Sequence, residues 1–391
     1  MKERWVERVE RFVVQVIYLR DDDVISSRSV RILLWFLRQI SRVYLAVTQL
    51  RLFLYAHGIF RHQTLGCQVI SVGNLTVGGT GKTPVVEIFA RDLQRAGRKV
   101  AILSRGYKKR QPRFATRVLD ILLLRERQRP PRVVSDGQHL LLDSAMSGDE
   151  PYMLASNLRD VVVLVDKDRV KSARYAIGRH GCDTLILDDG FQYLALKHRV
   201  EIVLVDCQNP FGNGYTLPRG TLREPVGNIR RATVVFITKC DGRDNSALKE
   251  QLRTLNPRAE IVECSHRTKY LQNVFTDERR PLEYLHDLDV AVISGIAAPE
   301  GFEHAVMSHG ARVVYRERFE DHHRYTQQQI LDVINKSREL QVSAIITTEK
   351  DAVRFPKIDR RDIPLFFLRV EIELLSGTEN FDECIARICF R

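Results

Sequence analysis

The sequence has none of the cysteine patterns that mark a zinc site or a disulfide framework. Its seven cysteines are scattered, and none stands in a CxxC pair or in metal-ligand spacing with histidines. Isolated thiols of this kind are typical of reduced cysteines in a cytosolic protein. We therefore expect a cytoplasmic chain without a structural metal site.

Long uninterrupted apolar runs are missing too, although residues 29–60 are rich in large apolar side chains. Arginines interrupt this segment. Its uncharged stretches, 43–50 and 52–60, are under half of the roughly 20 residues that a membrane-spanning helix needs. The segment therefore does not predict a span.

Its residues instead suit a helix that lies on a membrane surface. At 100° per residue, Arg28, Arg31, Arg38 and Arg42 fall within a stripe about 80° wide, and Arg51 falls outside it. Apolar side chains cover much of the remaining surface, namely Leu33, Leu34, Phe36, Leu37, Tyr44 and Leu45. A basic stripe beside an apolar face favours the lipid interface. The alternative is a helix that packs on the protein's own core with a solvated arginine edge.

Positive charge exceeds negative charge, with 61 Lys and Arg against 49 Asp and Glu, so the net charge is +12. A surplus of this size favours anionic partners such as nucleotide phosphates, acidic lipid or nucleic acid. No RNA-binding, zinc-finger or helix-turn-helix pattern supports the last of these. We therefore expect no nucleic-acid partner.

The clearest functional pattern is a glycine-rich loop between an apolar stretch and a helical one. Residues 68–72 read as a short buried strand, the loop GNLTVGGTGKTP follows at 73–84, and a helical pattern runs from 85 to 96. This is the context of a phosphate-binding P-loop, although Thr76 stands where the strict pattern has glycine. The residues expected to bind ATP phosphates are Thr76, Val77, Gly78, Gly79, Thr80, Gly81, Lys82 and Thr83.

A pair of acidic residues ends a second apolar stretch, as in a metal-binding Walker-B strand. Residues 181–187 (GCDTLIL) run into Asp188 and Asp189. We expect these carboxylates and the Thr83 hydroxyl to hold Mg²⁺ beside the P-loop. An acidic pair in an ordinary turn is the alternative.

A third pattern points to another function. Residues 238–241 (TKCD) resemble the guanine-reading motif of GTPases, so a P-loop GTPase or a nucleotide-dependent switch protein at the membrane is the alternative to a kinase. However, the acidic pair is followed by Gly and Phe rather than by a DxxG switch. The kinase is therefore the main prediction.

Taken together, the motifs resemble those of the tetraacyldisaccharide 4'-kinase family of lipid A biosynthesis. The matching segments run in family order from about residue 68 to 355: VGNLTVGGTGKTP, LSRGY, GDEP, DKDR, LDDGFQ, LREP, FEDHHRY and TTEKDAVR. The resemblance implies transfer of the ATP γ-phosphoryl group to the 4'-hydroxyl of a tetraacylated disaccharide 1-phosphate, giving a product of the lipid IVA type. It also implies a peripheral enzyme at the cytoplasmic face of the inner membrane, where the N-terminal helix would meet the lipid-linked substrate.

The resemblance also implies roles for individual residues. By its own residues Asp149 reads as a helix N-cap ahead of a proline; the family pattern makes it the proton acceptor, with His322 as its partner and Lys82 on the phosphates. Because Asp149 and His322 are 173 positions apart, we expect them to meet only when two domains close. The remaining phosphate- or substrate-binding residues implied are Arg105, Tyr107, Glu150, Arg169 and Arg223.

The order of apolar and helical stretches predicts an α/β chain with a P-loop-type, mostly parallel, doubly wound sheet and a second, smaller α/β domain. We expect an N-terminal extension and interfacial helix at 1–60, a kinase domain at 61–283 whose last part, 258–283, is a connector, and a C-terminal domain at 284–391. A basic insertion at 108–135 has no assigned role. The chain is expected to be a monomer that uses ATP and Mg²⁺.

Overall fold

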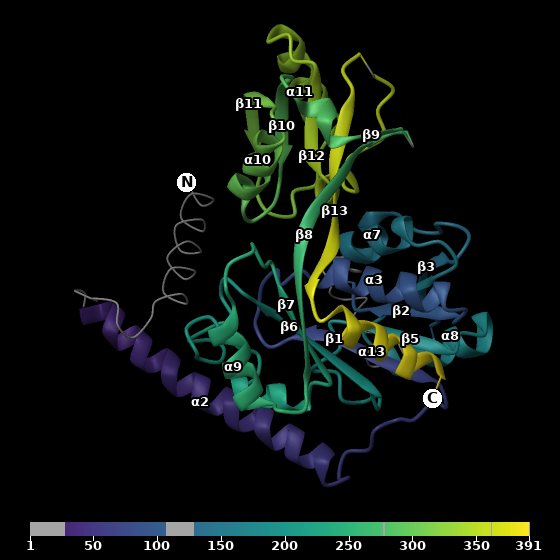
Figure 1. Cartoon of the computed structure of the whole chain (residues 1–391), viewed down its shortest axis with the longest axis vertical. Coiled ribbons are helices and arrows are strands. Elements are labelled where there is room, and N and C mark those ends of the chain that lie inside the picture. The colour runs from purple at the N-terminus through teal and green to yellow at the C-terminus, as the bar shows by residue number, and fades with distance from the viewer. Residues whose placement is uncertain (1–27, 107–128, 277, 361, 391) are drawn as a thin grey trace. The chain divides into compact units, whose positions relative to one another are not determined.

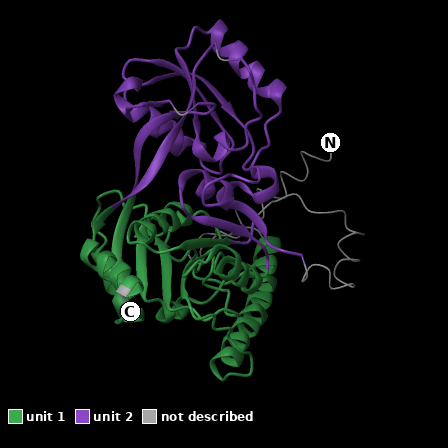
Figure 2. Cartoon of the chain, turned by 90° about the vertical axis from the view of Figure 1, so that its right-hand side faces the viewer, with its two compact units in different colours: residues 1–103, 168–265, 374–391 green, residues 104–167, 266–373 purple. Residues whose placement is uncertain are grey.

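The computed structural model describes residues 28–106, 129–276, 278–360 and 362–390 (Figure 1). The chain folds into two compact units (Figure 2): unit 1 takes its residues from 1–103, 168–265 and 374–391, and unit 2 from 104–167 and 266–373. Tyr107 and most of the basic insertion lie outside the described residues.

Unit 1 is built on a parallel sheet with helices beside it, as the sequence predicts. Its strands are ordered β8-β7-β6-β1-β5-β2, and each neighbouring pair is parallel. The strands are β1 (Gln68–Asn74), β2 (Val100–Ser104), β5 (Thr184–Asp188), β6 (Val200–Asp206), β7 (Val234–Thr238) and β8 (Glu260–Asn273). Its helices are α2 (Arg28–Ala56), α3 (Lys82–Arg95), α8 (Arg169–His180), α9 (Ser246–Leu255) and α13 (Thr378–Phe390).

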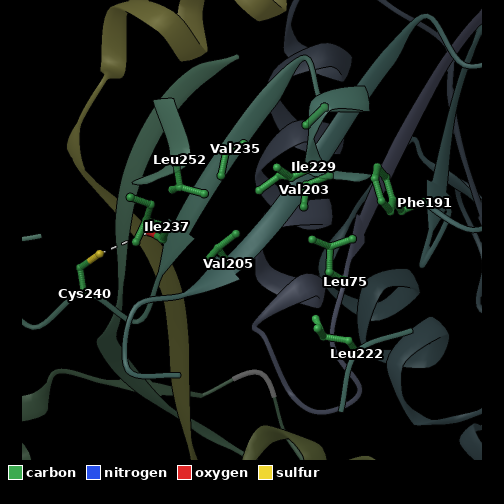
Figure 3. Packing of buried hydrophobic residues seen from close by; sticks show 11 residues of the cluster. Leu75, Phe191, Val203, Val205, Leu222, Ile229, Val235, Ile237, Cys240 and Leu252 are labelled. Atoms are coloured by element: carbon green, nitrogen blue, oxygen red, sulfur yellow. Dashed lines mark hydrogen bonds between the residues drawn. The ribbon is translucent and has the colours of Figure 1, made fainter. Parts of the chain in front are cut away.

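The central strands of unit 1 are continuous apolar runs because helices cover both faces of a parallel sheet. Every residue of β2, β5 and β7 is buried. On one side of the sheet, buried side chains from β6, β7, α9 and the loops form a single core that also contains Leu75 and Phe191 (Figure 3). Leu75 and Phe191 belong to the P-loop and the acidic-pair motif, so this core anchors both motifs.

Unit 2 contains a run of four parallel strands, ordered β11-β10-β12-β13. Val290 and Val292 of β10 lie in one buried cluster and Ala291 and Ile293 in another, because successive strand residues face opposite sides. The strands are β10 (Asp289–Ser294), β11 (Arg312–Arg318), β12 (Ala344–Thr348) and β13 (Leu365–Ser376), with helices α10 (Pro299–Ser308) and α11 (Gln327–Glu339).

The same unit includes an earlier part of the chain. There, β3 (Arg132–Asp136) pairs antiparallel with β4 (Val162–Val165). Between them come α6 (Ser144–Ser147) and α7 (Asp149–Asn157), and α12 (Glu349–Ala352) contacts α7. This arrangement brings the N-terminus of α7 to the loops that follow β10, β11 and β12.

The prediction of a connector at 258–283 is wrong. Most of that segment is β8, in which residues 262–265 are buried and residues 267–270 alternate between exposed and half-buried. Its second half has only two large apolar residues, Tyr270 and Leu271, and these are adjacent, so the sequence there lacks the apolar alternation of a typical strand. The two units also do not follow the consecutive boundaries that we expected, because strands β8 and β13 each carry the chain from one unit into the other.

Helix α2 is the longest helix described, at 29 residues. Among the described residues, no helix combines the length and the apolar character needed to cross a bilayer.

Candidate active site

The glycine-rich loop of unit 1 connects the end of β1 to the start of α3. Gly78 and Gly81 have positive φ angles of 126° and 78°, which glycine adopts without strain. A Cβ added at Gly78 or Gly79 would meet no atom within 4 Å, so the main chain borders open space there. A hydrogen bond holds Thr80 in place, since the Thr238 hydroxyl donates to the Thr80 carbonyl at 2.9 Å. The loop therefore offers main-chain amides and a helix N-terminus to a phosphate group.

The acidic pair lies directly beside the start of this loop. Asp188 ends β5 and is in register with Val72 of β1. A Cβ at Gly73 would come within 2.8 Å of the Phe191 main-chain nitrogen, so only glycine lets β1 approach the turn after Asp189 this closely. The close approach places the carboxylates next to the phosphate-binding loop.

Lys82, Asp189 and Arg223 form one charged cluster. Lys82 Nζ lies 3.5 Å from Asp189 Oδ1 and donates to Asn74 Oδ1 at 3.2 Å. Arg223 Nη1 donates to both Asp189 oxygens, at 2.9 and 2.8 Å. Burial disfavours the charged form of Asp189, but the charges of Lys82, Arg223 and Arg169 outweigh it and hold the pKa of this carboxyl below its usual value. Asp189 is thus an ionised carboxylate at neutral pH.

Arg223 and Arg169 reach this cluster from separate segments. The Arg223 amide donates to the Leu75 carbonyl and the Val77 amide to the Thr221 carbonyl, each at 2.7 Å, so the LREP segment lies along the P-loop. Arg169 is buried, donates to the Asp188 carbonyl at 3.3 Å and lies 4.9 Å from the Tyr193 ring centre. The structure therefore brings both predicted arginines to the acidic pair.

The donors in unit 1 fit a magnesium ion better than a softer metal. Thr83, Asp188 and Asp189 offer hydroxyl and carboxylate oxygens, which Mg²⁺ prefers. Among the described residues, no group of three or more His, Cys, Asp and Glu side chains could hold a metal. Mg²⁺ typically takes only one or two carboxylates and completes its shell with water and substrate phosphates, so this small donor set is sufficient.

The second predicted pair lies in unit 2. His322 Nδ1 is 3.0 Å from Asp149 Oδ2, at the N-terminus of α7. Both residues belong to the same compact unit, so the expectation that two domains must close to join them is wrong. The physical reason is that α7 contacts α12, which follows β12 in the same unit, rather than belonging to the P-loop unit. His322 has a positive φ of 65°, the left-handed region that non-glycine residues rarely adopt.

Sequence reasoning missed two arginines that hold Asp149. Arg324 Nη2 donates to Asp149 Oδ1 at 2.8 Å, and Arg354 Nε donates to Oδ2 at 2.8 Å. Burial disfavours ionisation of Asp149, but the His322 hydrogen bond and the charges of Arg354 and Arg324 outweigh it and lower its pKa. Both arginines stand in motifs already recognised, FEDHHRY and TTEKDAVR, but nothing local in these motifs shows that they meet Asp149.

His322 Nδ1 also lies 3.2 Å from Arg354 Nη2. An ionised carboxylate can only accept and a guanidinium can only donate, so Nδ1 bonds to one of these neighbours at a time. A proton on Nδ1 gives the bond to Asp149, whereas an unprotonated Nδ1 accepts from Arg354. The lowered pKa of Asp149 is consistent with the first arrangement.

The other predicted residues are less closely tied to these clusters. Glu150 lies in the first turn of α7, with its Oε1 3.5 Å from Lys350 Nζ. Arg105 follows β2 and is exposed. In unit 1, Gln192 and Asn74 were not predicted, yet Gln192 Nε2 donates to the Asn74 carbonyl at 3.1 Å and links the acidic-pair turn to the P-loop strand.

Comparison with known proteins identifies the family. The model of the family described as tetraacyldisaccharide-1-P 4'-kinase matches residues 33–389. The chain belongs to this family.

Named relatives support the same conclusion. A tetraacyldisaccharide 4'-kinase from Anaeromyxobacter sp. is 38% identical over 341 residues, covering 85% of this chain and 87% of the relative. One from Halothermothrix orenii is 34% identical over 372 residues, covering 91% and 92%. A crystal structure of LpxK from Aquifex aeolicus in complex with ATP has a TM-score of 0.71 and 27% identity, covering 92% of this chain and all of that one.

Family membership confirms the predicted activity, phosphorylation of a tetraacyldisaccharide in lipid A biosynthesis. It also confirms the predicted fold class, since an LpxK structure matches nearly the whole chain. The GTPase alternative rested on residues 238–241. In this kinase the Thr238 hydroxyl supports the P-loop main chain and Lys239 pairs with Asp206 at 2.5 Å.

Proposed function

We propose that this kinase transfers the γ-phosphoryl group of ATP to the 4'-hydroxyl of a tetraacyldisaccharide 1-phosphate, with Asp149 as the proton acceptor. One observation carries the proposal: an ionised, buried carboxylate is fixed between His322, Arg324 and Arg354. A kinase needs a group that takes the proton of its alcohol substrate, whereas a nucleotide switch has no such requirement.

The nucleotide phosphates would bind at the glycine-rich loop. Main-chain amides of Gly78, Gly79 and Gly81 and the α3 N-terminus would face the phosphate oxygens, and Lys82 supplies a positive charge within reach of Asp189. Thr83, Asp188 and Asp189 would hold Mg²⁺, which neutralises charge on the transferred phosphoryl group when bound. Arg169 and Arg223 add guanidinium donors on the same side.

The proposed phosphoryl transfer needs no reactant besides ATP and the disaccharide. The 4'-oxygen forms a bond to the γ-phosphorus while the bond from that phosphorus to the β,γ-bridging oxygen breaks, and ADP leaves. The hydroxyl proton passes to the Asp149 carboxylate. His322 orients this carboxylate by its Nδ1–H bond to Oδ2, and Glu150 and Arg105 would contact the substrate as the family pattern implies.

Helix α2 would bind the cytoplasmic face of the inner membrane, where the lipid-linked substrate lies. One face of α2 packs on the rest of unit 1, where the Ser41 hydroxyl reaches Thr216 and Tyr44 Oη donates to the Arg223 carbonyl at 3.0 Å. The opposite face carries large exposed apolar side chains that no described residue covers: Ile32, Trp35, Phe36, Ile40, Val43, Val47, Leu50 and Phe53.

This exposed strip is the face proposed to enter the lipid interface. It spans about 140° at 100° per residue, and Arg31 and Arg42 lie along one edge, where they would meet lipid phosphates. The face that we expected from the sequence is only partly this one, since Leu34 is buried and Tyr44 packs inward. We also propose that the kinase acts as a peripheral monomer.

The test is transfer of radiolabel from ATP to a 1-phosphorylated tetraacyl disaccharide in detergent micelles with Mg²⁺. The wild type should label the lipid. Asp149→Ala should keep its affinity for ATP while kcat falls by about 100-fold or more, the usual contribution of a general base. Asp332→Ala, an exposed aspartate of the same unit, should behave as the wild type. Hydrolysis of GTP without lipid labelling would favour the switch protein, and near-normal turnover by Asp149→Ala would remove the base assignment.

A further inference from the structure

We propose that Arg354 is a positioning residue that fixes Asp149 Oδ2 and thereby presents Oδ1 to the substrate hydroxyl. The inference rests on the proposed role of Asp149 as proton acceptor and names the group that sets its orientation.

The Arg354 side chain is fully buried and is held by three donated hydrogen bonds. Nε donates to Asp149 Oδ2 at 2.8 Å, and Nη1 donates to the Gly295 carbonyl at 3.0 Å and to Asp351 Oδ1 at 3.1 Å. A planar guanidinium with partners at both Nε and Nη1 cannot rotate or shift without losing several of these bonds. Arg354 is therefore a fixed reference for the carboxylate.

The partners of Arg354 are themselves held in place. Asp351 is fully buried and accepts from Tyr325 Oη at 2.9 Å and from the Thr348 hydroxyl at 2.6 Å. The Gly295 carbonyl also accepts from the His322 amide at 3.1 Å, so one carbonyl ties Arg354 to the loop that carries the histidine. A Cβ at Gly295 would lie 2.8 Å from the Tyr325 hydroxyl and 3.1 Å from Asp351 Oδ1. The tight packing leaves Arg354 a single position.

The two oxygens of Asp149 are bonded unequally. Oδ2 takes both the Arg354 and His322 bonds, whereas among the described residues Oδ1 accepts only from Arg324. A carboxylate oxygen has two lone-pair directions. Oδ1 therefore keeps one acceptor direction for the hydroxyl of the substrate, and this direction is defined because Arg354 stops the carboxylate from turning about its χ2 axis.

Arg369 provides a matched control within the same unit. Its side chain is also buried, with 4% exposure, and Nη1 donates to Glu349 Oε1 at 2.6 Å. Arg369 pairs with Glu349 and Glu371, not with Asp149. Arg369→Met therefore removes a buried arginine without touching the carboxylate.

The experiment compares Arg354→Met, Arg354→Lys and Arg369→Met in the micelle transfer assay, with unfolding curves for each. Arg354→Met should lower kcat by about 100-fold, the loss that a misplacement of the order of 1 Å produces, with KM for ATP unchanged. Arg354→Lys should recover part of that loss, because an ammonium can still donate to Oδ2. Equal losses in Arg354→Met and Arg369→Met would show a structural role only and overturn the inference.

A double mutant separates this inference from the base assignment. If Arg354 acts through Asp149, then Arg354→Met in an Asp149→Ala background should cost less than about threefold more in kcat. Losses that multiply would overturn the positioning role. Near-normal turnover by Asp149→Ala alone would instead overturn the proposed function, whereas normal turnover by Arg354→Met with an inactive Asp149→Ala would overturn only the inference.

Discussion

At the scale of single residues, two carboxylates in different units have similar electrostatic surroundings. Asp149 and Asp189 are each surrounded by cationic side chains that lower their pKa despite burial. Both are therefore ionised at neutral pH; we propose Asp149 as the proton acceptor and Asp189 as a ligand of Mg²⁺. Their cationic neighbours come from other segments of the chain, which is why each carboxylate depends on the tertiary fold.

Replacement of Asp189 by asparagine should destabilise the chain at neutral pH more than in acid. In the folded chain the pKa of Asp189 lies below the value of about 3.9 expected when unfolded. Its ionised form thus stabilises the folded state above that pH, and this contribution is lost as the pH falls through the lowered pKa. Urea-unfolding curves should show that the difference in free energy of unfolding between wild type and Asp189→Asn becomes smaller as the pH falls from about 7 to 3. A gap that stays constant with pH would contradict the assignment.

At the scale of elements, α2 has two distinct faces. Its inner face contacts the main chain of site segments, since Tyr44 bonds to Arg223 and the Arg51 guanidinium donates to the Gln192 carbonyl at 3.1 Å. Its outer face is apolar and exposed. The alternative of a helix packed on the protein's own core therefore describes the inner side, and the proposed lipid contact concerns the outer side.

Placing charge on the outer face of α2 should weaken membrane binding. Val43 and Val47 are 65% and 62% exposed, so Asp at both positions should leave the fold intact. Burying a valine in an apolar phase is worth about 1.5 kcal/mol or more, and loss of both should reduce vesicle affinity at least about tenfold. Co-sedimentation with anionic phospholipid vesicles measures this.

The control for this experiment is the double variant Val314→Asp and Leu340→Asp. These positions are exposed apolar residues of unit 2, and the variant adds the same charge away from α2. It should sediment with vesicles as the wild type does. Equal losses in both variants would indicate a general charge effect and remove the proposed role of the strip.

At the scale of the whole molecule, each unit is assembled from separated stretches of chain. Unit 1 includes the last residues of the chain, and Phe381 of α13 lies 4.9 Å from the Phe89 ring and 6.2 Å from the Phe236 ring, in edge-on contacts. Phe381 is 3% exposed. The C-terminal helix is therefore part of the core behind the P-loop helix rather than an appendage of unit 2.

Phe381→Ala should lower the free energy of unfolding by about 3–5 kcal/mol, the usual cost of removing a buried phenylalanine. Because Phe89 lies on α3, whose start is the phosphate-binding loop, the affinity for ATP should fall as the helix loosens. Denaturant unfolding and ATP titration measure the two effects. Leu375→Ala, an exposed change in the neighbouring strand, should alter neither, and an equal loss in both variants would contradict the packing argument.

The sequence by itself determined the local features of this protein. The buried strands, the phosphate-binding loop and the acidic pair follow from consecutive residues, because strand burial, glycine conformation and capping depend on near neighbours. Family motifs added Asp149 and His322. The sequence did not predict the long strand β8, because the second half of this strand has few apolar residues and no apolar alternation.

Only the tertiary structure decided which distant residues meet. Arg354 lies 205 positions from Asp149 and Arg324 lies 175 positions away, and no sequence spacing encodes such contacts. The exposed side of α2 was also undecided, since an apolar face looks alike whether it meets protein or lipid. These features depend on packing between segments that are far apart in the sequence. The ionisation of a carboxylate and the exposure of an apolar side chain are therefore set only when the chain has folded.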